Sequence, residues 1–422
     1  MNLTVKNVER IPVNVPFREV PARNMVRELP HWTLFEICKV TLECGVVGFG
    51  ETMQYYTWGT VSDEQVARAV GKNATEIMWD DSLGAGLQIA LFDAVGKANE
   101  APIHALMGPK HRDRCHISWW DIDMPGEDWV LECKQAISEG YTSFKTKARP
   151  WFDLVKQCET LCATLPPYFD MDMDFNALLV DSAHAVRLLQ RVEKFENVAI
   201  YESPIPQGDV EGGKHVRRHT RVAIAHHYGS PPIMTSLKED LCDGYVVGGG
   251  ATRVTRNAAV CQAANKPFWL QLVGTGITST FALHLGAVLS HAEWPAVNCH
   301  QLYTHHMVKP AISVFNGLAP VPEGPGLGVE LDEEAVERFR LPEMPDKPYP
   351  HPGLLLAIRW PSGATSYYTH LRQYWVDFQE GRLPLFPSGV YLENVADDGS
   401  AEWRDLQTRA QEAGVHLGGR PK

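Results

Sequence analysis

Two lysines separated by a single residue are the first candidates for catalysis in this chain. In the segment GYTSFKTKARP, residues 140–150, Lys145 and Lys147 flank a threonine within a run that has the composition of a β-strand. Residues two apart on a strand project from the same face, so the two ammonium groups lie side by side. Because like charges repel, this arrangement predicts that an anionic cluster faces the pair.

Carboxylates follow in the next two predicted strands. In YFDMDMDFN, Asp170, Asp172 and Asp174 share one face of the strand, while phenylalanine and methionine occupy the other, and AIYESP carries Glu202 near its end. If these strands are neighbours, two cations and four anions share one interior, and burying unpaired charges is costly. A divalent cation that prefers carboxylate oxygens, such as Mg²⁺, would balance the set.

Such a cluster favours proton abstraction next to a carboxylate. A lysine beside a metal and a second lysine is expected to have a lowered pKa, which suits a general base. The metal would bind a substrate carboxylate and stabilise the enediolate that forms when the α-proton leaves. A K-x-K pair or a D-x-D-x-D run alone is a weak signal, but their combination on consecutive strands is much more specific.

A repeated strand–helix pattern is what would bring these residues together. From about residue 115, short apolar strands alternate with helical stretches, and eight such units can be counted. Eight is the number in a (β/α)₈ barrel, whose chemistry lies at the carboxyl ends of the strands. Residues 1–114 instead read as a separate α+β domain, residues 115–320 as the barrel with the active site, and 321–422 as a further segment whose last part has no assigned fold.

Composition limits the classes of partner. The 422 residues carry a formal net charge of −12, which argues against nucleic acid and against anionic membranes as partners. No apolar run approaches the roughly 20 residues that span a bilayer, and the N-terminus lacks the core of a signal peptide. Nine scattered cysteines with no CxxC pair favour a reducing, cytoplasmic location with free thiols.

These motifs resemble those of the enolase superfamily, in the branch of mandelate racemase and muconate lactonizing enzyme. GLQIALFDAVGKANEAPIHALMG resembles the last capping-domain helix of that family, GYTSFKTKA its K-x-K, MDFNA its D-x-N, and YESPIP its E-x-P. The resemblance spans roughly residues 1–340. It implies an α/β fold with an α+β capping domain and a modified TIM barrel of the (β/α)₇β type, with GPGLGVELDEE as the return to the capping domain before a C-terminal extension.

The resemblance also implies roles for the charged residues. Lys147 would be the base, Lys145 would contact the substrate carboxylate and tune its partner, and Asp174 and Glu202 would bind one Mg²⁺. A homo-oligomer is expected on the same grounds.

The fifth strand departs from the family pattern. The third metal ligand of the family is a carboxylate that closes this strand, whereas VAIAHHYG has none. His226 or His227 could bind a metal through an imidazole nitrogen, and we select His227 as the candidate ligand. Equally, the two histidines could only form hydrogen bonds to the substrate or to a neighbouring strand.

The sixth and seventh strands show no second base. In CDGYVVGGGAT, Asp243 either is the aspartate of a dyad or precedes the predicted strand, which would leave Gly248 at the functional position, and WLQLVGTGI offers Gln271 without a histidine. Racemisation needs a base on each face of the substrate, whereas dehydration needs one base and an acid. His300, Tyr303 and His305 are candidates for that acid, and a syn elimination could reuse the first base.

The leading hypothesis is a Mg²⁺-dependent hydro-lyase that acts on a small carboxylate, an acid sugar of the aldonate or aldarate type. The alternatives are a racemase, epimerase or cycloisomerase of the same superfamily, and a non-catalytic enolase-fold binding protein, because a third ligand and a second base are not evident. Beside the catalytic and metal candidates, we predict the following substrate-binding residues: Arg23, His31, Trp58, Asn176, Gln271 and His300.

Overall fold

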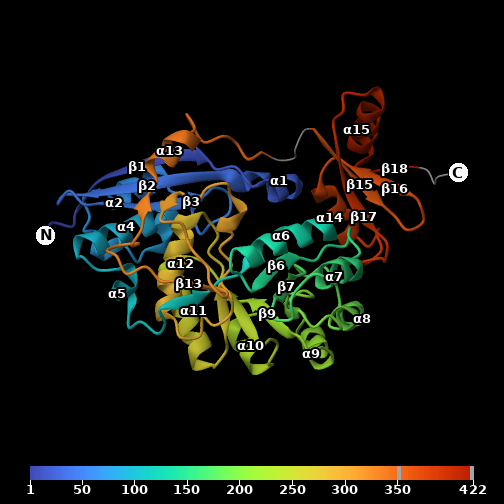
Figure 1. Cartoon of the computed structure of the whole chain (residues 1–422), viewed down its shortest axis with the longest axis horizontal. Coiled ribbons are helices and arrows are strands. Elements are labelled where there is room, and N and C mark those ends of the chain that lie inside the picture. Colours follow the sequence, from blue (N-terminus) through green and yellow to red (C-terminus); the bar gives the residue numbers. More distant parts are fainter. Residues whose placement is uncertain (349–352, 419–422) are drawn as a thin grey trace.

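The computed structural model describes residues 1–348 and 353–418. Figure 1 shows three parts in chain order: a blue N-terminal unit, a ring of strands and helices coloured from teal to yellow, and a red C-terminal unit beside the ring. The N-terminal unit lies against one end of the ring.

A three-stranded antiparallel sheet and one buried helix form the core of the N-terminal unit. The strands β1 (Val5–Asn14), β2 (Leu34–Leu42) and β3 (Val47–Met53) pair in that order, and helix α4 (Ala85–Ala98) packs on β2 and β3. A Cβ atom at Gly50 would lie 2.2 Å from the carbonyl oxygen of Gly86, so this close approach requires glycine. Shorter helices complete the unit: α1 (Glu19–Met25), η1 (Pro30–Thr33), α2 (Asp63–Ala69), α3 (Ala74–Ile77), η2 (Asp81–Leu83) and α5 (Ile103–Met107).

Seven parallel strands form the ring, and three of them carry the K-x-K, D-x-N and E-x-P motifs. Their order runs without interruption from β5 to β11, so each strand lies beside the one before it in the sequence. The strands are β5 (Trp119–Trp120), β6 (Ser143–Lys147), β7 (Asp170–Asp174), β8 (Val198–Glu202), β9 (Ala223–His227), β10 (Gly244–Val247) and β11 (Phe268–Leu270).

The ring closes through two isolated bridges. Ala296 pairs with Ile117 next to β5, and Val297 pairs with Gln271 just after β11. A short 3₁₀ helix, η3 (His300–Leu302), follows these bridges instead of an α-helix. The count of eight complete strand–helix units is therefore wrong for the last unit, because its segment makes too few pairs to form a strand. The (β/α)₇β-type barrel that the family resemblance implied is confirmed.

Helices cover the outside of the ring, and the sequence marks where several of them begin. Helices α7 (Leu154–Cys162), α8 (Ser182–Val192) and α9 (Val210–His219) each follow an aspartate whose carboxylate accepts a backbone N–H three residues later, the usual N-cap arrangement. The other outer helices are α6 (Gly126–Ser138), α10 (Ile233–Lys238), α11 (Ala251–Ala263) and α12 (Gly276–Val288).

After the ring, the chain returns to the N-terminal unit. Strand β13 (Leu318–Pro320) pairs with β4 (Arg114–His116), and α13 (Glu333–Phe339) contacts β1. Strands β12 (Val308–Lys309) and β14 (Glu330–Leu331) form a second short pair. The segment that precedes residue 341 therefore packs on the capping sheet.

Residues 353–418 form a further antiparallel sheet, for which the sequence analysis proposed no fold. Its strand order is β17-β15-β16-β18, and two helices accompany it. The elements are β15 (Leu354–Arg359), β16 (Thr365–Tyr368), α14 (Leu371–Gln379), β17 (Tyr391–Ala396), α15 (Ala401–Ala413) and β18 (His416–Gly418).

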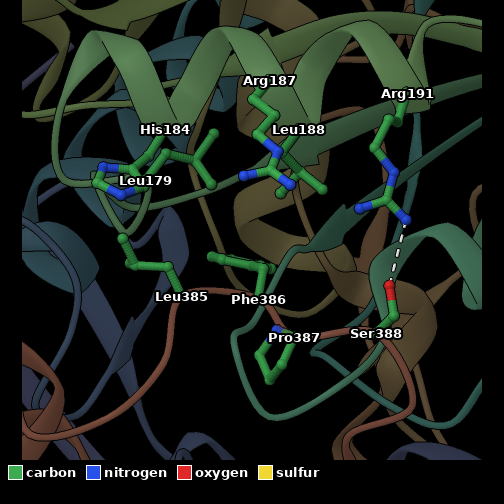
Figure 2. Close-up of a pocket in the computed structure, with 9 residues that line it drawn as sticks. All are labelled: Leu179, His184, Arg187, Leu188, Arg191, Leu385, Phe386, Pro387 and Ser388. Carbon is green, nitrogen blue, oxygen red and sulfur yellow. Dashed lines mark hydrogen bonds between the residues drawn. The ribbon is translucent and has the colours of Figure 1, made fainter.

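This C-terminal sheet unit packs on the barrel near β6 and α8. Trp151, which follows β6, packs edge-on against Tyr374 of α14 with ring centroids 5.1 Å apart. Figure 2 shows the loop with Phe386 facing α8, where Arg191 donates a hydrogen bond to Ser388 beside a cavity of about 250 Å³. Aromatic and polar contacts therefore anchor the unit to the barrel. Among the residues described, no helix combines the length and the apolar character needed to cross a bilayer.

Candidate active site

The three motifs end on adjacent strands at one level of the barrel. In the parallel register, Lys147 of β6 lies beside Asp174 of β7, and Asp174 lies beside Glu202 of β8. Lys145 lies two residues before Lys147 on the same face of β6. The structure thus brings together the two amines and two carboxylates that the sequence analysis singled out.

Each lysine is paired with a carboxylate. Lys145 Nζ contacts Glu202 Oε2, and both side chains are almost fully buried, at 1% and 0% exposure. Lys147 Nζ contacts Asp174 Oδ2 and lies 3.3 Å from Asn176 Oδ1. The backbone N–H of Asn176 donates to Asp174 Oδ1 over 2.8 Å and so holds this carboxylate in place.

Electrostatic interactions keep the buried pair of Lys145 and Glu202 ionised. Burial disfavours the ammonium form of Lys145, but the carboxylates of Glu202 and Asp174 outweigh burial and raise its pKa. Burial also disfavours the carboxylate of Glu202, yet Lys145 and His227 hold its pKa well below the ordinary value. For Lys145 the carboxylate of Glu202 therefore outweighs burial, and the lowered pKa expected of a catalytic base beside a bound metal stays a prediction.

The remaining aspartates of β7 carry less charge into the barrel than predicted. Asp170, at the start of the strand, is exposed. Asp172 is buried, and burial raises its pKa to about 8, so it is mostly protonated at neutral pH. Asp170 and Asp172 therefore add little negative charge to the interior, and the predicted excess of two anions over the lysines is wrong.

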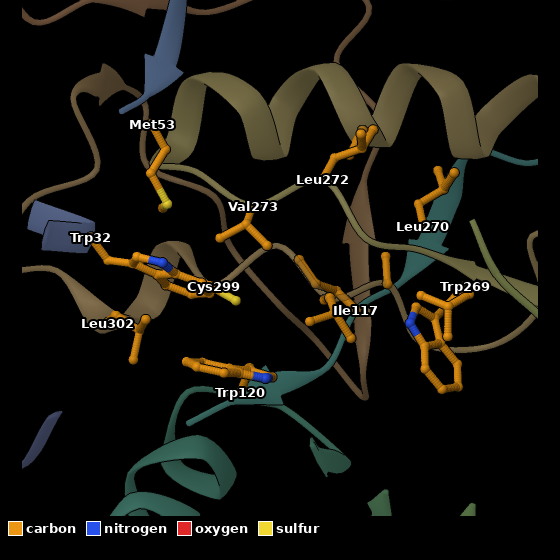
Figure 3. Close-up of a cluster of buried hydrophobic side chains, with 14 of the residues drawn as sticks. Trp32, Met53, Ile117, Trp120, Trp269, Leu270, Leu272, Val273, Cys299 and Leu302 are labelled. Atoms are coloured by element: carbon orange, nitrogen blue, oxygen red, sulfur yellow. The ribbon is translucent and has the colours of Figure 1, made fainter. Parts of the chain in front are cut away.

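The capping unit covers the site and leaves a cavity of about 220 Å³ beneath it. Trp32 of the capping unit stacks on Trp120 at the end of β5, with ring centroids 5.3 Å apart, and Figure 3 shows these rings with Met53 and Val273 nearby. Charged and polar groups from the cap and the strand ends also line the cavity: Glu28, Tyr56, Lys145, Lys147, Arg149, Asp174, Asn176, His227 and Gln271.

The ends of β9, β10 and β11 carry few ionisable groups. His227 Nε2 lies 2.8 Å from Glu202 Oε1, and this hydrogen bond raises the pKa of His227 despite its burial. Gly248 follows β10. Gln271 accepts a hydrogen bond from Lys145 over 3.3 Å and donates one to the Tyr56 hydroxyl over 3.1 Å. No lysine or aspartate among the described residues lines the cavity from this side.

Comparison with known proteins agrees with this geometry. Residues 128–335 match the family described as enolase C-terminal domain-like. Muconate cycloisomerase 1-1 of Acinetobacter lwoffii is 24% identical over 80% of this chain and 97% of its own length. The solved structure of 2-chloromuconate cycloisomerase from Rhodococcus opacus superposes with a TM-score of 0.68 at 19% identity, and covers 80% of this chain and 100% of that one.

The chain belongs to the enolase superfamily. Its place is in the branch of mandelate racemase and muconate lactonizing enzyme. A probable glucarate dehydratase of Streptomyces coelicolor is also similar, 25% identical over 60% of this chain and 64% of its own. Relatives at this identity carry different activities, so similarity alone does not define the reaction of this superfamily member.

The superfamily fold implies a divalent cation, and the donors can be tested against that expectation. Asp174, Glu202 and His227 end three adjacent strands, and two carboxylates with one imidazole are a donor set that binds divalent metals. As they stand, however, no three ligating side chains within residues 1–348 and 353–418 are arranged to hold a metal ion. The donor types fit, and the ammonium groups of Lys145 and Lys147 take the place of a cation beside the two carboxylates.

The other candidates from the sequence fall into two groups. Asn176 and Gln271 line the cavity, and Trp58 lines a second cavity next to it. Three candidates lie outside both. Arg23 pairs with Asp128 on α6, His31 is buried against Tyr55, and His300 is buried with its Nε2 3.1 Å from the Tyr141 hydroxyl. The structure therefore does not bring these three to the substrate position.

The proposed acids and the second histidine are also displaced from the cavity. Tyr303 is buried and donates to the carbonyl of Trp32, and His305 lies 3.4 Å from Asp332. Burial lowers the pKa of His226 to about 4, and this ring does not line the cavity, which leaves His227 as the histidine at the site.

Sequence reasoning missed Arg149. This residue continues the alternation of Lys145 and Lys147, and that spacing could have identified it. It is 2% exposed, lines the cavity, and lies 3.3 Å from Glu28 of the capping unit. Its guanidinium also lies 5.5 Å from the ring of Trp375, which belongs to the C-terminal sheet unit.

Proposed function

We propose that this chain is a carbon–oxygen lyase that removes the proton α to the carboxylate of a sugar acid and expels water. The observation that supports this proposal is the convergence of two amines and two carboxylates at the ends of β6, β7 and β8 beneath the cap. Because the opposite strand ends offer Gly248 and Gln271, one face of a substrate meets a base and the other does not.

The residues divide the work by position. Lys145 and Arg149 bind the substrate carboxylate, since both are buried cations that line the cavity. Lys147 takes the α-proton at Nζ, and the electron pair of the broken C–H bond moves into a new C–C double bond. The adjacent hydroxyl leaves, and Lys147 returns the proton to it on the same face, so water departs and the enol tautomerises to a keto-deoxy acid.

The same set of residues would accommodate Mg²⁺. Asp174, Glu202 and His227 would hold it, and a bound divalent cation would stabilise negative charge on the substrate carboxylate as the proton leaves. This arrangement requires the two lysines to release their carboxylates, and a substrate carboxylate provides them with a new partner.

A screen of acid sugars in deuterated water tests the proposal. The expected result is formation of a keto-deoxy acid from at least one sugar acid, with Mg²⁺ added, and binding of one divalent ion per chain in calorimetry. Deuterium exchange at the α-carbon with the substrate otherwise retained would instead support a racemase or epimerase. A cycloisomerase would interconvert a lactone and its acid without loss of water to a keto product.

A non-catalytic binding protein is the second candidate, because the carboxylates already have ammonium partners. That candidate predicts tight binding of an organic acid with neither proton exchange nor a requirement for metal. Absence of both metal binding and proton exchange would overturn the lyase.

A further inference from the structure

A second cavity opens from the candidate active site toward the far side of the barrel mouth. Its volume is about 380 Å³, and it shares Tyr56, His227, Gln271 and Val273 with the cavity that holds the lysines. Because the two cavities have these walls in common, a molecule bound at Lys147 can extend past Gln271 toward β10.

Glycines keep the second cavity open. Gly248 and Gly249 follow β10 and line the cavity, so no side chain projects into it from this strand end. A Cβ atom at Gly248 would lie 2.8 Å from the carbonyl oxygen of Gln271, and Gly249 has a φ of +113°. A larger residue is disfavoured at both positions, and the room that a strand-end side chain would fill remains available.

One cation faces this room without an ionic partner. Arg253, in the first turn of α11, lines the cavity, and its stem lies over Gly249. Within the described ranges, no carboxylate lies within ion-pair distance of its guanidinium. Asn257, one turn later on the same helix face, is buried, lines the same cavity, and makes no side-chain hydrogen bond within those ranges.

The carboxylate at the N-terminus of α11 already has partners. Asp81 of the capping unit accepts the backbone N–H groups of Thr252 and Arg253 and the side-chain amide of Gln88. The N-terminus of α11 is therefore capped by the capping unit and is not itself an anion site. These bonds also fix the helix that presents the Arg253 side chain to the cavity.

We propose that the substrate is a sugar diacid, with its reacting carboxylate at Lys145 and Lys147 and its distal carboxylate bound by Arg253 and Asn257. A guanidinium forms a two-pronged contact with a carboxylate, and the Asn257 amide adds one more donor. This assignment rests on the proposed lyase function, since it places the reacting end at the lysines, but it makes its own prediction about binding.

The experiment compares six-carbon sugar diacids with the monoacids of the same configuration, for example glucarate with gluconate. Binding is measured by calorimetry and turnover by keto-acid formation, both with Mg²⁺ present. The variants are R253M and, as a control, R256M, which removes an exposed arginine of the same helix that does not line the cavity. In the unmodified protein we expect the favoured diacid to bind about tenfold more tightly than its monoacid, the size of one charge-assisted contact.

In R253M that preference should fall to near unity while monoacid binding is unchanged, and R256M should behave as the unmodified protein does. A preference that survives in R253M, or the absence of any preference across the diacids tested, overturns the subsite. The outcome also separates the two proposals. A preference for diacids that depends on Arg253, without turnover, supports the subsite and counts against the lyase. Turnover that R253M does not affect supports the lyase and counts against the subsite.

Discussion

The two halves of the barrel mouth are built differently. The ends of β6, β7 and β8 carry Lys147, Asp174 and Glu202, whose charges are paired and largely shielded from solvent. The ends of β10 and β11 carry Gly248 and Gln271 beside the larger cavity. One half therefore has the paired amines and carboxylates to which we assign the proton transfer, and the strand ends of the other half offer space and neutral hydrogen-bonding groups.

Under the proposed function, this asymmetry assigns the reaction to one half of the barrel mouth and the choice of substrate to the other. A buried pair of charges is costly to rearrange, so the β6–β8 half constrains which reaction is possible. The β10–β11 half can change a side chain while the charge pairs of β6–β8 stay in place, so it is suited to determine which molecule fits. Each of the following changes acts on one half and leaves the other as a reference.

The largest loss of activity is expected from K147A. Removing a general base lowers the rate by at least about 100-fold, and K147R should fail to restore it because an arginine does not release its proton near neutral pH. The measurement is α-proton exchange by NMR, with K134A as the control because Lys134 is exposed on α6. Exchange that persists in K147A would mean that the base lies elsewhere.

The largest loss of stability is expected from E202Q. The change leaves the Lys145 ammonium buried beside a neutral amide, and breaking a buried pair in this way costs about 3–5 kcal/mol. E393Q is the matched control, since Glu393 pairs with Arg359 on the surface of the C-terminal sheet unit and should cost less than about 1 kcal/mol. Urea unfolding at pH 7 measures both. Equal losses for the two variants would show that the buried pair has no special role in stability.

A pH-dependent effect is expected from D172N, on the charged half. In the folded chain the pKa of Asp172 is about 8, against an ordinary value of 3.8, so between these values the unfolded chain has lost a proton that the folded chain keeps. Stability therefore falls as pH rises through this window, by up to about 1.4 kcal/mol per pH unit. D172N removes this contribution, so its stability relative to the unmodified protein should increase from pH 6 to pH 8. Urea unfolding at both pH values checks the difference, and a constant difference would contradict the raised pKa.

The charged half was largely predictable from the sequence, and the physical reason is local. Alternation on a strand places Lys145 beside Lys147, and the order of parallel strands places Asp174 and Glu202 next to them. The protonation of Asp172 was not predictable, because it depends on burial that only the closed barrel produces.

The contributions of the capping unit and of the C-terminal sheet unit were harder to foresee. Glu28 and Tyr56 reach the cavity from loops more than 80 residues before β6, and only the family resemblance, not a periodic pattern, indicates that such loops face the barrel mouth. Trp375 reaches Arg149 from a segment whose proline- and aromatic-rich sequence gave no periodic signal for its strands. The position of Arg149 itself could have been read from its spacing.

The smallest effect is expected from Q271L, on the neutral half. Gln271 joins the two cavities and connects Lys145 to the Tyr56 hydroxyl, so its loss leaves both groups less firmly oriented while every charge stays paired. Q271L removes one hydrogen bond to a charged group, Lys145, and one to a neutral group, Tyr56. Their loss should decrease kcat/KM by about fivefold to tenfold, with little change in unfolding free energy. Y56F removes one of the two contacts and should produce the smaller part of that decrease. If Q271L instead abolished turnover as K147A does, the neutral half would take part in the chemistry itself, and the division between the two halves would fail.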